Sequence, residues 1–481
     1  MTVIDGRASG VLLHVSSLHG EYSIGSFGRC AFEFIDFLAE GGFSYWQVLP
    51  FCIPDECDSP YKSDSAFAGN PLFIDLALLA SEGLLSADEL TLALQKTPYA
   101  TESARLRAER EPLLRKAASR AKNRAQILEF IKARPQLHDA CRFLALKRAN
   151  GGRPWWEWKA LEPLSEDFFY FAFTQFHFHR QWQAVKAYAN GKGISIIGDL
   201  PIYVALDSAD VFANRAQFCL DEAGKPTEVA GVPPDYFSKD GQMWGNPLYR
   251  WSAMKQDGFA WWRSRMAHTL ELFDGVRIDH FRGIEAYWAI PATAKSAVEG
   301  RWRKGPGMAF VRAMREVAGD RLIIAEDLGD RTPAVDALLK KSGFPGMRVF
   351  QFAFLGDKAS PHLPHTYEQN CVAYTGTHDN NTLLGYVWEL DATTRRRMLE
   401  YCGYTDADWD RGYDAIVRTM LQSHAGLVIL PIQDLLGFGA DTRMNTPGRA
   451  EGNWSYRITR EQLQALDRTK YRRFNELYGR I

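Results

Sequence analysis

The stretch Gly275-Val276-Arg277-Ile278-Asp279-His280 shows most directly how this chain folds. Val276 and Ile278 are β-branched, flank a single charged residue and are followed at once by an acid and a histidine. A short run of this composition that ends in polar residues is typical of a buried β-strand whose carboxyl end reaches an open face of the protein. The same pattern recurs along the chain, so we expect a fold built from repeated strands of this kind.

Eight such runs are spaced widely enough for a helix to connect most consecutive pairs. We predict strands over residues 11–15, 45–49, 194–197, 276–278, 322–325, 348–352, 371–374 and 427–430. Eight strands with helical crossovers predict an α/β fold, the (β/α)8 TIM barrel. The alternative is a doubly wound sheet. That fold would carry a glycine-rich phosphate-binding turn after its first strand, where this sequence reads Ser16-Ser17-Leu18-His19-Gly20.

The uneven spacing of the strands predicts where segments are inserted into the barrel. We expect residues 1–481 to form a single barrel domain, with a mainly helical insertion at 76–180 between strands 2 and 3. Within it, Ser86 and Glu89 match a capping box, and Pro112 is placed as a helix start. An insertion at 205–273 between strands 3 and 4 is expected to be a long irregular segment with an active-site loop. Too few residues follow the eighth strand for a C-terminal β-sandwich domain.

The composition excludes several classes of protein. With 46% hydrophobic and 24% charged residues, the chain is an ordinary globular one rather than a disordered or fibrous one. It has 57 basic and 58 acidic residues, so no overall basic field attracts nucleic acid or an anionic membrane, and we expect neither as a partner. Its seven cysteines are irregularly spaced and its N-terminus lacks a secretory signal pattern, so the expected location is cytoplasmic.

Four of the predicted strands are followed by acidic residues. Asp199 comes at the end of the third strand, Asp279 after the fourth, Glu326 and Asp327 after the fifth, and Asp379 after the seventh. The carboxyl ends of barrel strands meet at one mouth, where catalytic groups gather on loops held in place by the strands. Carboxylates that converge repel one another. We therefore expect this set to serve a cation or a catalytic reaction.

A divalent cation is one possible use of these acids. Its candidate ligands would be Asp279, Glu326, Asp327 and Asp379, with His280 and His378 beside them. The sequence has no His-Glu-x-x-His motif, and Cys52 and Cys57 have no Cys or His partner pattern. We therefore expect neither a metal nor another cofactor.

Cleavage of a glycosidic bond is the other possible use. It needs an ionised carboxylate as nucleophile and a protonated carboxyl as acid and then base, about 5 to 5.5 Å apart when the configuration is retained. Arg277 lies two residues before Asp279 on the same side of the strand, so its charge would keep Asp279 ionised. Glu326 would have a raised pKa because negative charges surround it. The 13% of aromatic residues would suit a large core or stacking on sugar rings.

Three motifs carry a resemblance to a known family. They are Gly275-Val-Arg-Ile-Asp-His280, Ala325-Glu-Asp-Leu-Gly329 and Gly376-Thr-His-Asp-Asn-Asn-Thr382. These resemble signatures of the 4-α-glucanotransferases, also called amylomaltase or disproportionating enzyme, within the α-amylase clan. The resemblance runs nearly end to end and includes residues 9–18, 59–61, 65–71, 236–238, 241–249 and 448–454.

The resemblance implies roles for individual residues. Asp279 would be the nucleophile, Glu326 the acid and base, and Asp379 the stabiliser of the transition state. Arg277 would lie against the nucleophile, and His378 would donate to sugar hydroxyls. The other implied substrate-binding residues are Tyr61 for stacking, Asp199 for support or contact, Tyr236, Phe237 and Trp244 on the loop, and Asn453 on the donor side.

The resemblance also implies a reaction. An α-1,4-glucan segment would pass, with retention and through a covalent glucosyl-enzyme intermediate, to the 4-hydroxyl of glucose or another glucan. The implied partners are maltooligosaccharides, glucose and linear α-glucan. An α-1,4-glucan hydrolase of the amylase type is the main alternative, because it shares the first half-reaction. A non-catalytic glucan-binding protein is disfavoured, because a binder has no need of repelling carboxylates.

Overall fold

Eight parallel strands close into a barrel in the order β1-β12-β11-β10-β9-β6-β3-β2. The computed structural model describes residue 4 and residues 6–234, 239–329, 331–355 and 360–481. The barrel strands are β1 Ala8–Leu12, β2 Tyr45–Gln47, β3 Ser195–Leu200, β6 Gly275–Ile278, β9 Ile323–Ala325, β10 Gly346–Val349, β11 Cys371–Tyr374 and β12 Leu427–Pro431. The predicted (β/α)8 barrel is therefore confirmed, and the doubly wound alternative is wrong because the sheet closes on itself.

Two of the predicted strands are displaced along the chain. The first is predicted over 11–15, whereas β1 begins at Ala8 and ends at Leu12. A Cβ on Gly10 would lie 2.5 Å from the Tyr45 carbonyl oxygen, so β1 needs small residues that hydrophobicity does not reveal. The sixth is predicted over 348–352, but residues 350–352 of that range form a 3-10 helix after β10.

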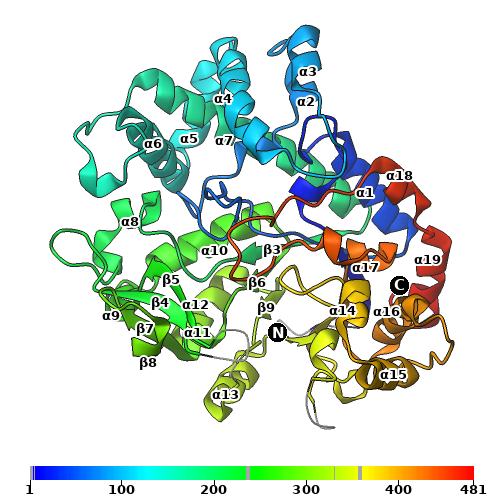
Figure 1. Cartoon of the computed structure of the whole chain (residues 1–481). Coiled ribbons are helices and arrows are strands. Elements are labelled where there is room, and N and C mark those ends of the chain that lie inside the picture. The colour runs from blue at the N-terminus through cyan, green and yellow to red at the C-terminus, as the bar shows by residue number, and fades with distance from the viewer. Residues whose placement is uncertain (1–3, 5, 235–238, 330, 356–359) are drawn as a thin grey trace.

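A large helical segment lies between β2 and β3, in the upper part of Figure 1. It comprises α2 Leu76–Ser81, α3 Ala87–Ala93, α4 Ser103–Ser119, α5 Arg124–Lys132, α6 Pro135–Ala149 and α7 Ser165–Gly191. The capping box of Ser86 and Glu89 is confirmed at the start of α3. The helix start at Pro112 is wrong, because Pro112 lies inside α4. Leu106 and Leu114 are buried on either side of it, so tertiary packing carries the helix past the missing N–H group.

A second sheet of four antiparallel strands lies beside the barrel, at the lower left of Figure 1. Its order is β5-β4-β7-β8, with β4 Glu228–Val232, β5 Gln242–Pro247, β7 Ala286–Pro291 and β8 Arg301–Lys304. Two of these strands come from the segment after β3 that the sequence predicts to be irregular, so that prediction of irregularity is wrong. Their glycine, proline and exposed positions hide the alternation that marks a strand.

The remaining helices cover the barrel. They are α1 Arg29–Glu40, α8 Ala209–Ala213, α9 Trp251–Gln256, α10 Ala260–Leu272, α11 Arg282–Glu285, α12 Met308–Ala318, α13 Pro333–Ser342, α14 Leu383–Glu389, α15 Ala392–Tyr401, α16 Gly412–Gln422, α17 Ile432–Leu436, α18 Arg460–Ala465 and α19 Arg468–Leu477. The C-terminal α19 packs against α1, at the right of Figure 1. In the described part of the chain, no helix has the length and apolar character to cross a membrane.

Aromatic side chains fill much of the space between the barrel and α7. Phe51 makes ring contacts with Phe27, Phe178 and Trp182, at centroid distances of 5.7, 6.1 and 4.6 Å. All four residues are buried. A large share of the aromatic content therefore serves packing, which fixes the strands that carry the candidate site.

Candidate functional site

The acids that end the strands meet at one mouth of the barrel. Asp199 lies directly opposite Arg277 in the pairing of β3 with β6. Ile278 lies opposite Ala325 in the pairing of β6 with β9, so the next residues, Asp279 and Glu326, also leave their strands side by side. The parallel register thus brings together groups that are far apart in sequence.

Arg277 is the centre of this group, and its side chain is only 4% exposed. Its Nε and Nη2 donate to the two carboxylate oxygens of Asp199, at 3.1 and 2.6 Å. Its Nη1 donates to Glu326 Oε2 at 3.0 Å, and its Nη2 to Asp279 Oδ1 at 3.2 Å. One buried guanidinium group therefore offsets the charge of three acids. Among the described residues, no group of three or more His, Cys, Asp and Glu side chains is arranged to hold a metal ion.

The Asp279 and Glu326 carboxyl groups are close enough to hydrogen-bond each other. Burial and the charge of Glu326 raise the pKa of Asp279 well above its usual value. Burial also acts to raise the pKa of Glu326, but Arg277, the bond with Asp279 and the His280 N–H group together lower it below its usual value. The two groups thus behave as a pair that shares one proton.

The sequence predicts the opposite distribution, with Asp279 ionised and the pKa of Glu326 raised. That prediction is wrong in this structure, for a geometric reason. The shortest bonds of Arg277 go to Asp199, so Asp279 receives only a share of its charge. Glu326 Oε2 receives both Arg277 Nη1 and, at 2.8 Å, the backbone N–H of His280.

His280 adopts a backbone conformation that is unusual for a residue with a side chain. Its φ angle is 45°, in the left-handed region, which costs conformational energy outside glycine. This conformation directs the His280 N–H group at Glu326. The resulting hydrogen bond is one of those that hold the Glu326 carboxylate in place. Its ring meets Trp244 edge to face at a centroid distance of 5.1 Å.

Asp379 is held separately from Arg277 and is more open, with its side chain 46% exposed. Asn445 Nδ2 donates to its Oδ1 at 2.6 Å, and His378 Nε2 lies 3.4 Å from the same oxygen. Arg443 Nη2 donates to the Asp379 carbonyl oxygen at 2.6 Å. The sequence does not predict Asn445 or Arg443, because they reach the site from a loop more than sixty residues further along the chain.

Tyr61, His378 and Trp454 form an aromatic cluster at the mouth. The rings of Tyr61 and His378 stack at 5.2 Å with an interplanar angle of 11°, and Trp454 lies 5.9 Å from Tyr61. The Tyr61 hydroxyl donates to Asp199 Oδ2 at 2.6 Å. Burial and Asp199 raise the pKa of that hydroxyl, so it remains a donor. Trp454 is a part of this cluster that the sequence does not single out.

The antiparallel strands bring Trp244 to the site. Trp244 lies on β5, is partly buried, and donates from Nε1 to Gln242 Oε1 at 3.1 Å. Asn246 Nδ2 donates to the Val204 carbonyl oxygen at 2.9 Å, which ties the end of β5 to the segment after β3. Tyr236 and Phe237 lie outside the described residues.

Asn453 uses its amide within its own loop. Its Oδ1 accepts from the Thr446 N–H group at 2.8 Å, and its Nδ2 donates to the Arg449 carbonyl oxygen at 2.8 Å. This arrangement gives Asn453 a role in shaping the loop that presents Trp454. The contact with substrate that the resemblance implies remains a prediction.

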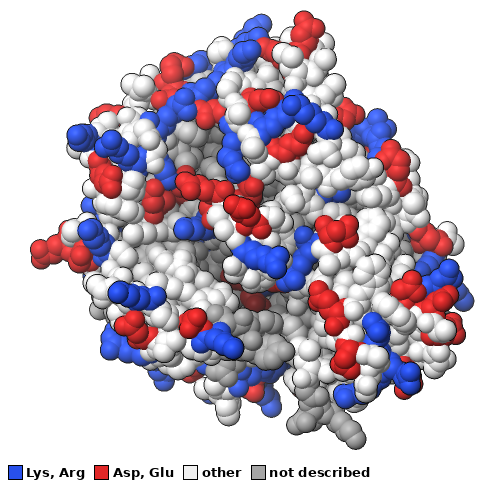
Figure 2. Space-filling view, in the orientation of Figure 1, with Lys and Arg blue, Asp and Glu red and all other residues white. Residues whose placement is uncertain are grey.

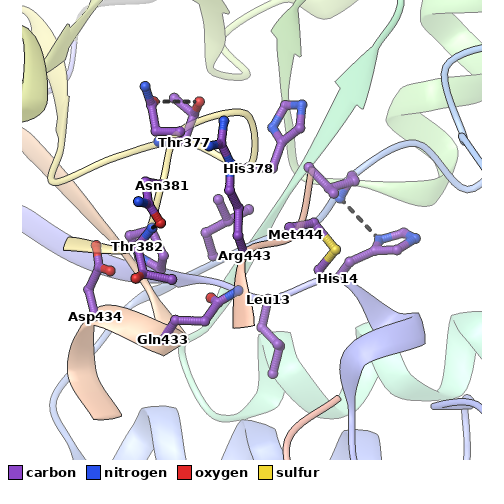
Figure 3. Close-up of a pocket in the computed structure, with 14 residues that line it drawn as sticks. Leu13, His14, Thr377, His378, Asn381, Thr382, Gln433, Asp434, Arg443 and Met444 are labelled. Carbon is purple, nitrogen blue, oxygen red and sulfur yellow. Dashed lines mark hydrogen bonds between the residues drawn. The ribbon is translucent and has the colours of Figure 1, made fainter. Parts of the chain in front are cut away.

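Two cavities adjoin the mouth. The smaller, of about 20 Å³, lies under the loop that carries His378, and Figure 3 shows His14, Asp434 and Arg443 around it. The larger, of about 640 Å³, runs between the barrel and the helical segment, and Trp454 and His14 line both it and the mouth region. Its volume is within the range of ligand sites. The face in Figure 2 is hollowed near its middle, with acidic and basic side chains around the hollow.

The chain resembles known proteins over nearly its whole length. The family model described as 4-alpha-glucanotransferase matches residues 13–463. The 4-alpha-glucanotransferase of Thermus thermophilus is 44% identical over 502 aligned residues, which cover 99% of each chain. The chloroplastic/amyloplastic 4-alpha-glucanotransferase of Arabidopsis thaliana is 41% identical and covers 99% of this chain and 86% of its own.

The solved structures agree. Amylomaltase from Streptococcus agalactiae, determined in complex with acarbose, superposes with a TM-score of 0.94 at 37% identity, over 98% of this chain and 99% of its own. Amylomaltase from Corynebacterium glutamicum superposes with a TM-score of 0.83 at 19% identity and shows the shared fold. With this coverage and identity, the chain belongs to the 4-alpha-glucanotransferase family.

Proposed function

We propose that this chain disproportionates maltooligosaccharides. It cleaves an α-1,4-glucan and passes the glycosyl segment to the 4-hydroxyl of glucose or of another glucan. The observation that carries the proposal is that the Asp279 and Glu326 carboxyl groups both accept from the Arg277 guanidinium group, at 3.2 and 3.0 Å. Carboxyl groups held this close together do not leave the wider spacing, about 6.5 to 9.5 Å, that an inverting reaction needs for its water.

In the first half-reaction Asp279 attacks C1 of the sugar while Glu326 gives its proton to the departing glycosidic oxygen. Glu326 Oε2 is occupied by Arg277 and His280, so Oε1 is the oxygen that holds this proton. The pair shares one proton, so Asp279 is ionised and can attack in the form of the pair in which Glu326 holds that proton. The product is a glycosyl ester of Asp279 and a free 4-hydroxyl on the leaving sugar.

Other residues hold the substrate around this pair. Asp379, with one oxygen held by Asn445, offers its other oxygen to sugar hydroxyls as positive charge develops at C1. His378 and Tyr61 lie beside it and form the wall for the sugar on which the nucleophile acts. Asp199 is buried with both oxygens bonded to Arg277, so its role is to fix Arg277 rather than to touch sugar.

In the second half-reaction Glu326 removes a proton from the acceptor hydroxyl, which attacks C1 and releases Asp279. Water at about 55 M competes with a dilute sugar, so transfer depends on an oriented acceptor and on exclusion of water. Trp244, which packs against the ring of His280, supplies an apolar face for that acceptor, and the N–H group of His280 bonds to Glu326. Tyr236 and Phe237, which lie outside the described residues, remain predicted contributors to acceptor binding. The cavity lined by Trp454 supplies room for a longer chain.

The proposal extends to where the protein acts. All seven cysteines are free thiols, among them the exposed Cys57, which suits the reducing cytoplasm. Short glucans released from glycogen or starch would be the substrates there. Neither nucleic acid nor a membrane is a proposed partner, because the formal charge is only −1.

The test is to incubate the pure protein with maltotriose and to separate the products. We expect glucose plus a ladder of longer maltooligosaccharides, with almost no net rise in reducing ends. Asp279→Asn serves as the control for contaminating activity. Reducing ends that rise with every bond cleaved, and no product longer than maltotriose, would establish the hydrolase instead. If the protein binds maltotriose but forms no product, it is a glucan-binding protein without catalytic activity.

A further inference from the structure

The segment that follows α17 is attached to the loop that carries Asp379 by three hydrogen bonds. Asn445 N–H donates to the His378 carbonyl oxygen at 3.1 Å, and Arg443 Nη2 donates to the Asp379 carbonyl oxygen at 2.6 Å. Asn445 Nδ2 donates to Asp379 Oδ1 at 2.6 Å. Figure 3 shows the Arg443 side chain extending toward the loop with Thr377 and His378. The segment therefore hydrogen-bonds to both the backbone and the carboxylate of Asp379.

Asp379 is held by different partners from those that hold the other acids. Asp199, Asp279 and Glu326 each bond to the buried Arg277, which lies on a barrel strand. Asp379 lies on a loop, and its side chain is 46% exposed. Within the described part of the chain, its Oδ1 accepts from Asn445, whereas its Oδ2 accepts no hydrogen bond from the protein.

We propose that Asn445 is the positioning residue for Asp379. Its amide holds Oδ1 and so fixes the carboxylate plane with Oδ2 turned outward for a sugar hydroxyl. Arg443 supports this action, because its Nε donates to the Asn445 carbonyl oxygen at 2.8 Å. The inference rests on the proposed function, in which Asp379 binds the sugar most strongly in the transition state. Loss of the amide should therefore lower kcat rather than raise KM.

The first variant removes the donor while keeping the size. Asn445→Leu should lower kcat for maltotriose disproportionation by about tenfold to a hundredfold, because a carboxylate free to rotate is often misplaced. We expect KM to change by less than about threefold. Thr446→Val, at the next residue, is the matched control and should keep kcat within about twofold. A kcat of Asn445→Leu within twofold of the wild type overturns the proposal.

The second variant makes the same contact depend on pH. In Asn445→Asp two carboxyl groups share the position, so one of the two holds a proton at acidic pH and donates to the other, as the amide does. The kcat of this variant, divided by the wild-type value at the same pH, should be high near pH 5 and fall at least tenfold by pH 8. The same ratio for Asn445→Leu should stay low throughout.

These outcomes separate the inference from the proposed function. If the wild type makes no products longer than maltotriose, the proposed function fails before any variant is measured. If the wild type transfers glucan but the Asn445→Asp ratio does not change with pH, Asn445 only shapes the loop and the inference fails. This second measurement follows the Asn445→Asp variant relative to the wild type across pH, so it does not depend on how Asn445→Leu folds.

Discussion

Four acids of the same chemical kind differ at this mouth because of what each one touches. Asp199 has no exposed side-chain surface and both its oxygens bonded, so it anchors Arg277. Asp279 and Glu326 share a proton, and Asp379 keeps one oxygen for a ligand. The sequence names all four, since each ends a strand or follows one. The sequence does not predict which of these acids Arg277 bonds to most closely, because that depends on distances that differ by a few tenths of an ångström.

Asp279→Asn tests the assignment of the nucleophile. The amide cannot form the glycosyl ester, so turnover should fall by several orders of magnitude while the protein stays folded and binds sugar. Steady-state kinetics, thermal unfolding and binding of maltooligosaccharide measure these three properties. Asp327→Asn is the contrasting change, because Asp327 bonds to the Met347 N–H group and to Arg348 on β10 rather than to Arg277. It should reduce stability and keep kcat within a few-fold, and wild-type turnover of pure Asp279→Asn would refute the assignment.

Asp434→Asn tests a buried acid beneath the same loop. Asp434 accepts from Thr375 Oγ1 and from the Leu383 N–H group at the start of α14, and burial raises its pKa to about 7. In the unfolded chain this acid loses its proton near pH 4. Between pH 4 and 7 the folded protein therefore binds more protons, so its free energy of unfolding falls as pH rises and levels off above pH 7.

Asparagine does not titrate, so the Asp434→Asn variant does not show this fall in the free energy of unfolding. The stability of Asp434→Asn relative to the wild type should rise by an amount on the order of 4 kcal/mol between pH 4 and pH 7.5. Urea unfolding at several pH values measures the difference, in which the other titrating groups cancel. A difference that stays constant over this range would show that Asp434 is ionised in the folded protein throughout.

At the scale of elements, the barrel and the second sheet differ in how far sequence predicts them. The barrel strands are short apolar runs, and the sequence predicts all eight, with errors where small residues such as Gly10 meet a neighbouring strand. The strands β4, β5, β7 and β8 come from two separate connections and pair only with one another. Their positions depend on tertiary pairing, so local patterning gives little signal for them. Trp244 is nevertheless predicted at the site, through the resemblance.

Trp244→Ala tests what the β4–β5 hairpin does. Trp244 packs against His280, whose N–H group bonds to Glu326, so its removal opens the acceptor side to water. The ratio of transfer to hydrolysis with maltotriose should fall several-fold, with a smaller loss in the rate of bond cleavage. Met243 is the preceding residue on the same strand, is 41% exposed, and points to the opposite face. Met243→Ala should leave the ratio unchanged, and an equal fall in both variants would show that the hairpin as a whole is responsible.

At the scale of the whole molecule, closure of the barrel pairs the first strand of the chain with the last. β1 pairs with β12 over five residue pairs, from Ala8 with Leu427 to Leu12 with Pro431. Arg480, near the end of the chain and 2% exposed, lies beside the pairing of β1 with β12, which is called the seam below. The sequence predicts the strands but not this tie, since an arginine next to the C-terminus gives no sign that it is buried. The sequence gives no sign that Asn445 or Arg480 matters, because the partner of each is distant in sequence and becomes close only in the folded chain.

Arg480→Met tests how far this seam supports the fold. The Arg480 guanidinium group donates to four carbonyl oxygens, those of Ala8, Leu421, Ser423 and Ala425, at 2.6 to 3.2 Å. Methionine fills the space but removes all four bonds, and Arg7 still donates to only two of these oxygens, those of Leu421 and Ser423, so the free energy of unfolding should fall by about 3 kcal/mol. Arg473→Met is the matched control, because its side chain is 70% exposed, and should change stability by less than about 0.5 kcal/mol. Urea unfolding measures both. If Arg480→Met loses less than about 1 kcal/mol, strand pairing and apolar burial close the barrel without the C-terminal arginine.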